Sequence, residues 1–155
     1  MKLTRKTEYA IRAILYLSSK KPNTKAMAKE ISDKMDIPKQ FLAQVMLSLN
    51  HHGYVRAIRG ANGGFILAKK PGSINLLEII EAIEGKVFLN NCLVSRSECP
   101  SQTVCPITDV WGEAQAALLK VLKRATFSAL VKKAKEKQKI AGTIDKNACC
   151  QSLFS

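Results

Sequence analysis

The sequence predicts a mainly α-helical protein with a small β-hairpin, a winged helix-turn-helix that continues into a long dimerisation helix. Two short segments with apolar residues at helical spacing flank a tight turn, and a hairpin signature follows them. After residue 105, an apolar stripe runs too far for a few short helices to cover it. We expect residues 1–72 to form the winged helix-turn-helix and residues 73–140 a cysteine-rich loop with the dimerisation helix. Residues 141–155 are expected to be a disordered tail.

The first three helices are expected at residues 4–19, from residue 24 to about 35, and from residue 38 to about 52. Thr24 is expected to cap the second helix, because a threonine hydroxyl can accept a backbone N–H there. Pro38 suits the first position of the third helix. That helix is expected to bury five apolar residues: Phe41, Leu42, Val45, Met46 and Leu49. Two short helices joined by such a turn, the second with a polar outer face, form a helix-turn-helix pattern.

A wing is expected directly after this pattern. Residues 54–59 alternate like a strand, residues 60–64 are a glycine-rich turn, and residues 65–68 return. Glycine would let the backbone of this turn approach DNA closely. Arg59, beside the turn, can enter a narrow minor groove of high negative potential.

Three more helices are expected after the wing. One begins at Asn75 with a capping-box spacing and ends at Gly85, a longer one runs from Pro106 to about residue 125, and a basic one spans about residues 128–139. Because a symmetric DNA reader needs a two-fold partner, the long apolar stripe predicts a homodimer.

The net charge of +13 is unevenly distributed along the chain. Residues 1–72 hold 14 basic and 4 acidic side chains, whereas residues 73–119 hold 2 and 6. A basic N-terminal half is what binding to the phosphates of double-stranded DNA requires. No segment reaches the roughly 20 apolar residues that cross a bilayer, so no membrane partner is expected. Five cysteines without a recognisable secretion signal favour a reducing cytoplasm.

Three cysteines, Cys92, Cys99 and Cys105, lie in one short polar segment. Clustered thiolates are the usual ligands of iron–sulfur clusters and of zinc, and three of them leave one ligand to come from elsewhere. Structural cysteines prefer apolar surroundings, which this segment does not offer. We therefore expect a metal centre, either an iron–sulfur cluster or zinc. The alternatives are that the cysteines are incidental small residues or a protective disulfide pair. Cys149 and Cys150, in the tail, are expected to be thiols of no fixed role.

Several motifs resemble the Rrf-two family of winged-helix regulators, which includes iron–sulfur cluster regulators and nitric-oxide sensors. They are MKLTRKTEYA at the start of the chain, Ile37-Pro38, RGANGGF at residues 59–65, LLEIIEAIEG at residues 76–85, the three-cysteine loop and the helix around Trp111. The resemblance covers about residues 1–130. It implies a homodimer that binds a pseudo-palindromic operator and holds an iron–sulfur cluster, of either the two-iron or the four-iron type.

The resemblance also implies which residues hold the cluster. Cys92, Cys99 and Cys105 match the three cysteine ligands of relatives that carry one. Some relatives add a histidine shortly after the third cysteine, but residues 106–109 contain none. Others use a carboxylate from the first helix of the partner subunit, and Glu8 stands at the matching place. Asp109 is the local alternative.

The function that we expect is a transcriptional regulator that senses redox state, nitric oxide or iron–sulfur status. A cluster-free or zinc-binding regulator that acts through protein–protein contacts is the alternative. An enzyme is not expected, since the sequence shows neither a His–carboxylate pairing nor a glycine loop of the nucleotide-binding kind. Lys39, Gln40 and Gln44 are expected to contact base edges. Arg59 and Asn62 are expected to contact DNA from the wing. Thr4, Lys6 and Arg56 are expected to contact phosphates.

Overall fold

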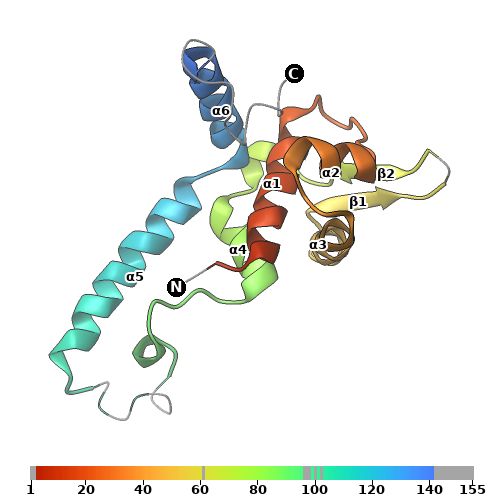
Figure 1. Ribbon diagram of the computed structural model, residues 1–155. Coiled ribbons are helices and arrows are strands. Elements are labelled where there is room, and N and C mark those ends of the chain that lie inside the picture. The colour runs from red at the N-terminus through yellow and green to blue at the C-terminus, as the bar shows by residue number, and fades with distance from the viewer. Residues whose placement is uncertain (1–2, 61, 96–98, 100, 102, 142–155) are drawn as a thin grey trace.

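A computed structural model of the chain describes residues 3–60, 62–95, 99, 101 and 103–141 (Figure 1). This part of the chain is mainly helical and has a single two-stranded antiparallel hairpin, which confirms the predicted fold class. The helices and strands are α1 Arg5–Ser19, α2 Ala28–Met35, α3 Lys39–His51, β1 Val55–Ile58, β2 Gly64–Leu67, α4 Leu76–Glu84, α5 Pro106–Arg124 and α6 Phe127–Ala141. Short 3₁₀ turns, η1 Pro71–Ser73 and η2 Asn91–Leu93, precede α4 and follow it.

Helix α1 is the centre of the core and contacts α2, α3, α4, α6 and β2. Ala10 and Ala13 are fully buried on it, and these small side chains let neighbouring helices pack closely. Phe127, at the start of α6, is also fully buried in this core. The C-terminal helix therefore packs back onto the N-terminal one, and the core includes residues from both sides of position 72.

The second helix begins later than the sequence predicts. The N–H of Thr24 donates to the Lys21 carbonyl in a turn, and α2 begins only at Ala28. The intervening Ala26 is extended and pairs with Phe65 of the wing in an isolated antiparallel bridge. Thr24 therefore does not cap α2, because pairing with the wing holds residues 24–27 out of the helix.

One predicted core residue of α3 is not buried. Phe41 is 39% exposed, whereas Leu42, Val45, Met46 and Leu49 are buried as expected. At 100° per residue, Phe41 lies about 90° from the centre of that buried stripe. It packs at the edge of the core against Tyr9 of α1, with ring centroids 5.7 Å apart.

The wing is the hairpin of β1 and β2, in which Val55 pairs with Leu67 and Ile58 with Gly64. Gly60 has a φ of +113°, which the turn requires and which favours glycine. A Cβ on Gly64 would lie 2.5 Å from the carbonyl oxygen of Ala26. Gly64 is therefore needed for close packing within the protein, a reason that the sequence analysis did not anticipate.

Helix α5 extends away from the rest of the molecule, with the cysteine loop at its far end (Figure 1). The side chain of Gln115 fixes the segment that enters this loop: Oε1 accepts from the Leu89 N–H at 2.9 Å, and Nε2 donates to the Val87 carbonyl at 2.5 Å. No residue of α5 is fully buried. Val110 and Val121 are each 64% exposed, so part of its apolar stripe is uncovered in the single chain.

Within the described residues, no helix is long and apolar enough to cross a membrane.

Candidate DNA-binding and cysteine sites

The outer face of α3 carries the side chains predicted to read bases. Lys39, Gln40 and Gln44 are exposed there, as is Ala43 between them. A groove of about 300 Å³ adjoins this face, lined by Ala28, Lys29, Lys39, Leu42, Ala43 and Phe65. Lys29 from α2 thus shares the groove with Lys39. Lys29 was not predicted from the sequence, because the first turn of this helix was expected earlier, at residue 24, and only the structure places Lys29 in it.

The tip of the wing presents Arg59 and Asn62, which are both exposed. The ammonium group of Lys25 donates a hydrogen bond to the Asn62 carbonyl. This contact ties the wing tip to the segment before α2, and the Ala26–Phe65 bridge lies beside it. Lys25 is therefore a wing-positioning residue. The sequence did not predict this contact, because its two residues lie 37 positions apart in the chain.

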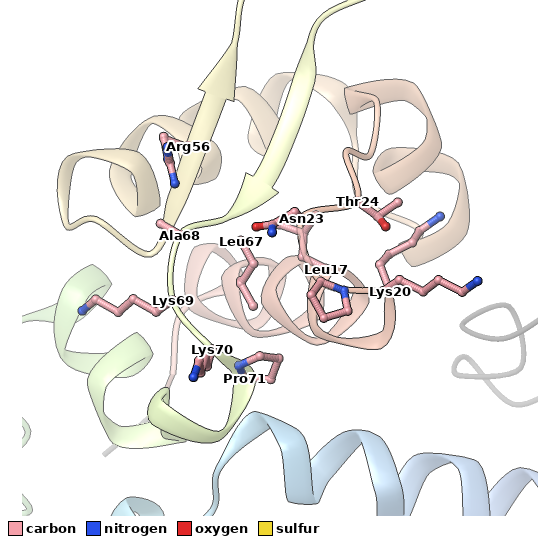
Figure 2. Close-up of a pocket in the computed structure, with 12 residues that line it drawn as sticks. Leu17, Lys20, Asn23, Thr24, Arg56, Leu67, Ala68, Lys69, Lys70 and Pro71 are labelled. Atoms are coloured by element: carbon pink, nitrogen blue, oxygen red, sulfur yellow. The ribbon is translucent and has the colours of Figure 1, made fainter.

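Arg56, predicted to contact phosphate, lies in a different place from the base-reading residues. It borders a hollow of about 460 Å³ that it shares with Leu17, Asn23, Leu67, Lys69 and Lys70, among others (Figure 2). Figure 2 shows Lys20 and Lys69 extending away from this hollow on opposite sides. Lys69 lies over the ring of Tyr54, 4.3 Å from its centroid. The cations thus form a basic rim around an apolar floor.

Lys20 on this rim is not an isolated charge, because it forms an ion pair with Glu30 of α2. The hydrogen bond to Glu30 raises the pKa of Lys20 above its ordinary value. Tyr16 donates to the same carboxylate at 2.5 Å. Although burial alone would raise the pKa of Glu30, its hydrogen bonds from Lys20 and Tyr16 outweigh burial and lower it. The triad fastens α2 to the end of α1.

Thr4 and Lys6, also predicted to hold phosphates, lie at the start of α1. The Thr4 hydroxyl donates to Glu84 Oε1 at 2.7 Å and its N–H donates to the same atom at 2.9 Å. Thr7 donates to that oxygen as well. Both donors of Thr4 therefore contact α4 within the chain, while Lys6 is half-buried. The sequence did not predict a role for Thr7 or Glu84.

The three cysteines of the loop line one common hollow of about 310 Å³. Cys92 comes from η2, Cys99 from the loop, and Cys105 from the residue that precedes α5; all three are half-buried thiols. The remaining lining residues are Asn90, Asn91, Ile107, Thr108 and Trp111. Soft thiolates gathered in one half-enclosed hollow are a donor set that suits iron–sulfur clusters or zinc.

Within the single chain, neither Glu8, which was expected to reach these thiols from the partner subunit, nor Asp109 lies beside them. Glu8 lines a separate hollow with Leu3, Thr4 and Arg5, and its Oε2 accepts from Arg5 at 2.9 Å. Asp109 is exposed and does not line the cysteine hollow. Across the described residues, no three His, Cys, Asp or Glu side chains already stand in position to hold a metal ion. The three thiols of the hollow suit a cluster by their chemistry, but they would have to draw closer together to hold one.

Comparisons with known proteins agree with this architecture. Residues 3–133 match the Rrf2 (Rrf-two) family, described as an iron-dependent transcriptional regulator. The chain is 35% identical over 132 residues to the HTH-type transcriptional regulator NsrR of Bacillus licheniformis, which covers 84% of this chain and 92% of that protein. Among solved structures, IscR of T. potens is similar with a TM-score of 0.71 and 25% identity, covering 89% of this chain and 91% of the other.

CymR, the global cysteine regulator of B. subtilis, is similar with a TM-score of 0.70 and 26% identity, covering 85% of this chain and 97% of the other. The family match spans both the wing and the cysteine loop, and the relatives are regulators of transcription rather than enzymes. The chain therefore belongs to the Rrf2 family of DNA-binding transcriptional regulators.

Proposed function

We propose that this regulator works as a homodimer on a pseudo-palindromic operator and senses redox state, nitric oxide or iron–sulfur status through a cluster on Cys92, Cys99 and Cys105. The observation that carries the proposal is that these three thiols line one hollow. The reducing cytoplasm, in which thiols persist, is the compartment that we propose for it.

The shape and charge of the N-terminal half support the mode of DNA binding. A recognition helix fits the major groove, and the exposed Lys39, Gln40 and Gln44 offer donors and acceptors to base edges. Arg59, at the projecting tip of the wing, is placed for an adjacent minor groove. Lys29, beside Lys39, adds a phosphate contact to the set expected from the sequence.

The uncovered face of α5 supports the dimer. Ile107, Val110 and Val121 are each more than half exposed on one side of this helix. A second copy that packs there would bury them, and a two-fold axis would present two recognition helices to half-sites one helical turn apart. The same arrangement would bring Glu8 of the partner subunit towards the cysteine hollow as the fourth ligand.

A chain of contacts supports coupling between the cysteine hollow and the DNA-binding half. Gln115 of α5 holds residues 87–89, which connect the loop to the end of α4. Glu84, the last residue of α4, is hydrogen-bonded to Thr4 and Thr7 of α1. A rearrangement of the loop would therefore displace α1 and, with it, the spacing of the two recognition helices.

The test uses the full chain, reconstituted with iron and sulfide under anaerobic conditions. Operator sequences are first selected from random double-stranded DNA with the loaded protein, and affinity is then compared between loaded and chelator-treated protein. We expect visible thiolate-to-iron absorption, iron and sulfide bound in equal amounts, and an affinity change of about tenfold. The matched control replaces all three cysteines of the hollow with serine and leaves Cys149 and Cys150 in place.

Three outcomes separate the alternatives. Absorption that disappears in the triple serine variant, together with altered DNA affinity, supports the proposal. A colourless protein with bound zinc favours the zinc-binding alternative. A protein that takes up neither metal and binds DNA equally before and after treatment contradicts metal sensing and favours a cluster-free regulator.

A further inference from the structure

Thr108 has a buried hydroxyl that nothing in the described part of the chain satisfies. It lies in the first turn of α5, three residues after Cys105, and lines the same hollow as the three thiols. Only Ser18 Oγ shares this condition among the described residues, and Ser18 belongs to α1 rather than to the hollow. A buried polar group without a partner is destabilising, so native proteins seldom keep one without a use.

The carbonyls that a helical threonine usually bonds do not take up the Thr108 hydroxyl. A helical threonine commonly donates to the carbonyl three or four residues earlier. Here the Thr108 N–H donates to the Cys105 carbonyl at 3.1 Å, but the Thr108 hydroxyl bonds neither that carbonyl nor the Val104 carbonyl. Thr108 lines a hollow that it shares with the three cysteines, and its buried hydroxyl lies in the wall of that hollow without a partner among the described residues.

We propose that the Thr108 hydroxyl donates a hydrogen bond to sulfur of the cluster and thereby sets its reduction potential. The sulfur is a cysteine thiolate or a bridging sulfide, and this inference rests on the proposed cluster function. Reduction places additional negative charge on the sulfur atoms, and a hydrogen-bond donor stabilises that charge. Thr108 thus makes the cluster easier to reduce, since hydrogen bonds to sulfur are among the factors that set such potentials.

The experiment compares three variants of the full-length protein, all reconstituted with iron and sulfide. Thr108→Val removes the hydroxyl and keeps the shape, Thr108→Ser keeps a hydroxyl, and Thr103→Val is a matched control at an exposed position of the same loop. Iron and sulfide per chain are measured first, followed by an anaerobic redox titration. We expect equal cluster content throughout and a midpoint potential that becomes more negative only in Thr108→Val.

A second measurement, made on the cluster-free protein, tests whether the Thr108 hydroxyl lacks a hydrogen-bond partner. Because Thr108→Val deletes a donor that has no partner in the described part of the chain, the apo variant should unfold at the same temperature as the apo wild type, or higher. A clearly lower unfolding temperature would mean that the hydroxyl has a protein partner, and would overturn the proposal.

The outcomes also distinguish this inference from the proposed function. A Thr108→Val protein with full cluster content and an unchanged potential overturns the hydrogen bond and leaves the sensing function standing. A Thr108→Val protein that takes up no cluster shows that Thr108 is required for assembly rather than for tuning, and overturns the proposal. A wild-type protein that takes up no cluster contradicts both.

Discussion

Glu84 accepts a hydrogen bond from the hydroxyl of Thr7, which joins the last residue of α4 to the first turn of α1. Thr4 adds two more donors to the same oxygen. The N-terminus of a helix also favours negative charge, because its unsatisfied N–H groups carry partial positive charge. The hydrogen bonds from Thr7 and then from Thr4 hold the pKa of Glu84 below its ordinary value of 4.5. The ends of α4 and α1 are therefore fixed to one another.

Replacing Glu84 with Gln should weaken the fold at neutral pH and reduce its sensitivity to acid. Because the folded-state pKa of Glu84 is lowered, its contribution is present above its unfolded pKa and is lost as pH falls through the folded value. Urea unfolding measured from neutral pH to below pH 4.5 should show a shallower acid limb in the variant than in the wild type. Glu113→Gln, at an exposed position of α5, is the control. Identical acid limbs in all three proteins would argue against this role.

Phe127→Ala should destabilise the whole protein. The side chain is fully buried against α1, and removing a buried phenylalanine costs about 3–5 kcal/mol of unfolding free energy. Urea denaturation followed by circular dichroism measures this loss, with Ser128→Ala, an exposed neighbour, as the control. If only the helical signal of α6 disappears while the rest unfolds normally, α6 is not part of the core.

Arg59→Ala should weaken specific DNA binding more than Lys132→Ala or Lys133→Ala in α6. A guanidinium inserted into a groove is expected to contribute about 1–3 kcal/mol, or roughly 5- to 150-fold in affinity, whereas a peripheral lysine makes one diffuse phosphate contact. Titrations on one selected operator at fixed salt concentration make the comparison. Equal losses would remove the support for the wing as a groove reader.

Val121→Glu should convert the proposed dimer into a monomer. Val121 is 64% exposed on the apolar side of α5, so a charge there costs the single chain little but would be buried between two copies. Sedimentation velocity should show the mass halved. Lys123→Glu introduces the same charge about 160° away around the helix and should remain dimeric. A dimer that persists in Val121→Glu would place the interface elsewhere.

Glu8→Ala should leave a cluster that assembles but decays faster in air. A carboxylate is a harder and weaker ligand for iron than a thiolate, so the proposed fourth position is the labile one. The decay of visible absorption after exposure to air measures this, with Asp109→Ala compared under the same conditions. A wild-type lifetime in Glu8→Ala, combined with loss of the cluster in Asp109→Ala, would make the fourth ligand local.

Local patterns in the sequence were enough to predict most of the helices and the hairpin. The first and third helices, the wing and α5 each follow from a repeat of apolar residues or a glycine-rich turn, which short segments contain in full. The capping box of α4 is also local: Asn75 accepts from the Glu78 N–H at 3.0 Å, and the Glu78 carboxylate accepts in return from the Asn75 N–H. The gathering of Cys92, Cys99 and Cys105 in one hollow agrees with their closeness in the chain.

Other features of the fold and of the sites depend on contacts between residues that are distant in the sequence, and only the tertiary structure decided them. The pairing of Ala26 with Phe65 delays α2 and excludes Thr24 as its cap, and the neighbouring α1 accommodates Phe41 at the edge of the core. Glu84 meets Thr7 across 77 residues. The hydroxyl of Thr108 is buried without a partner among the described residues, which the sequence does not reveal. A periodic sequence determines which face of a helix is apolar, but the partner of each side chain is decided by how the helices pack against one another.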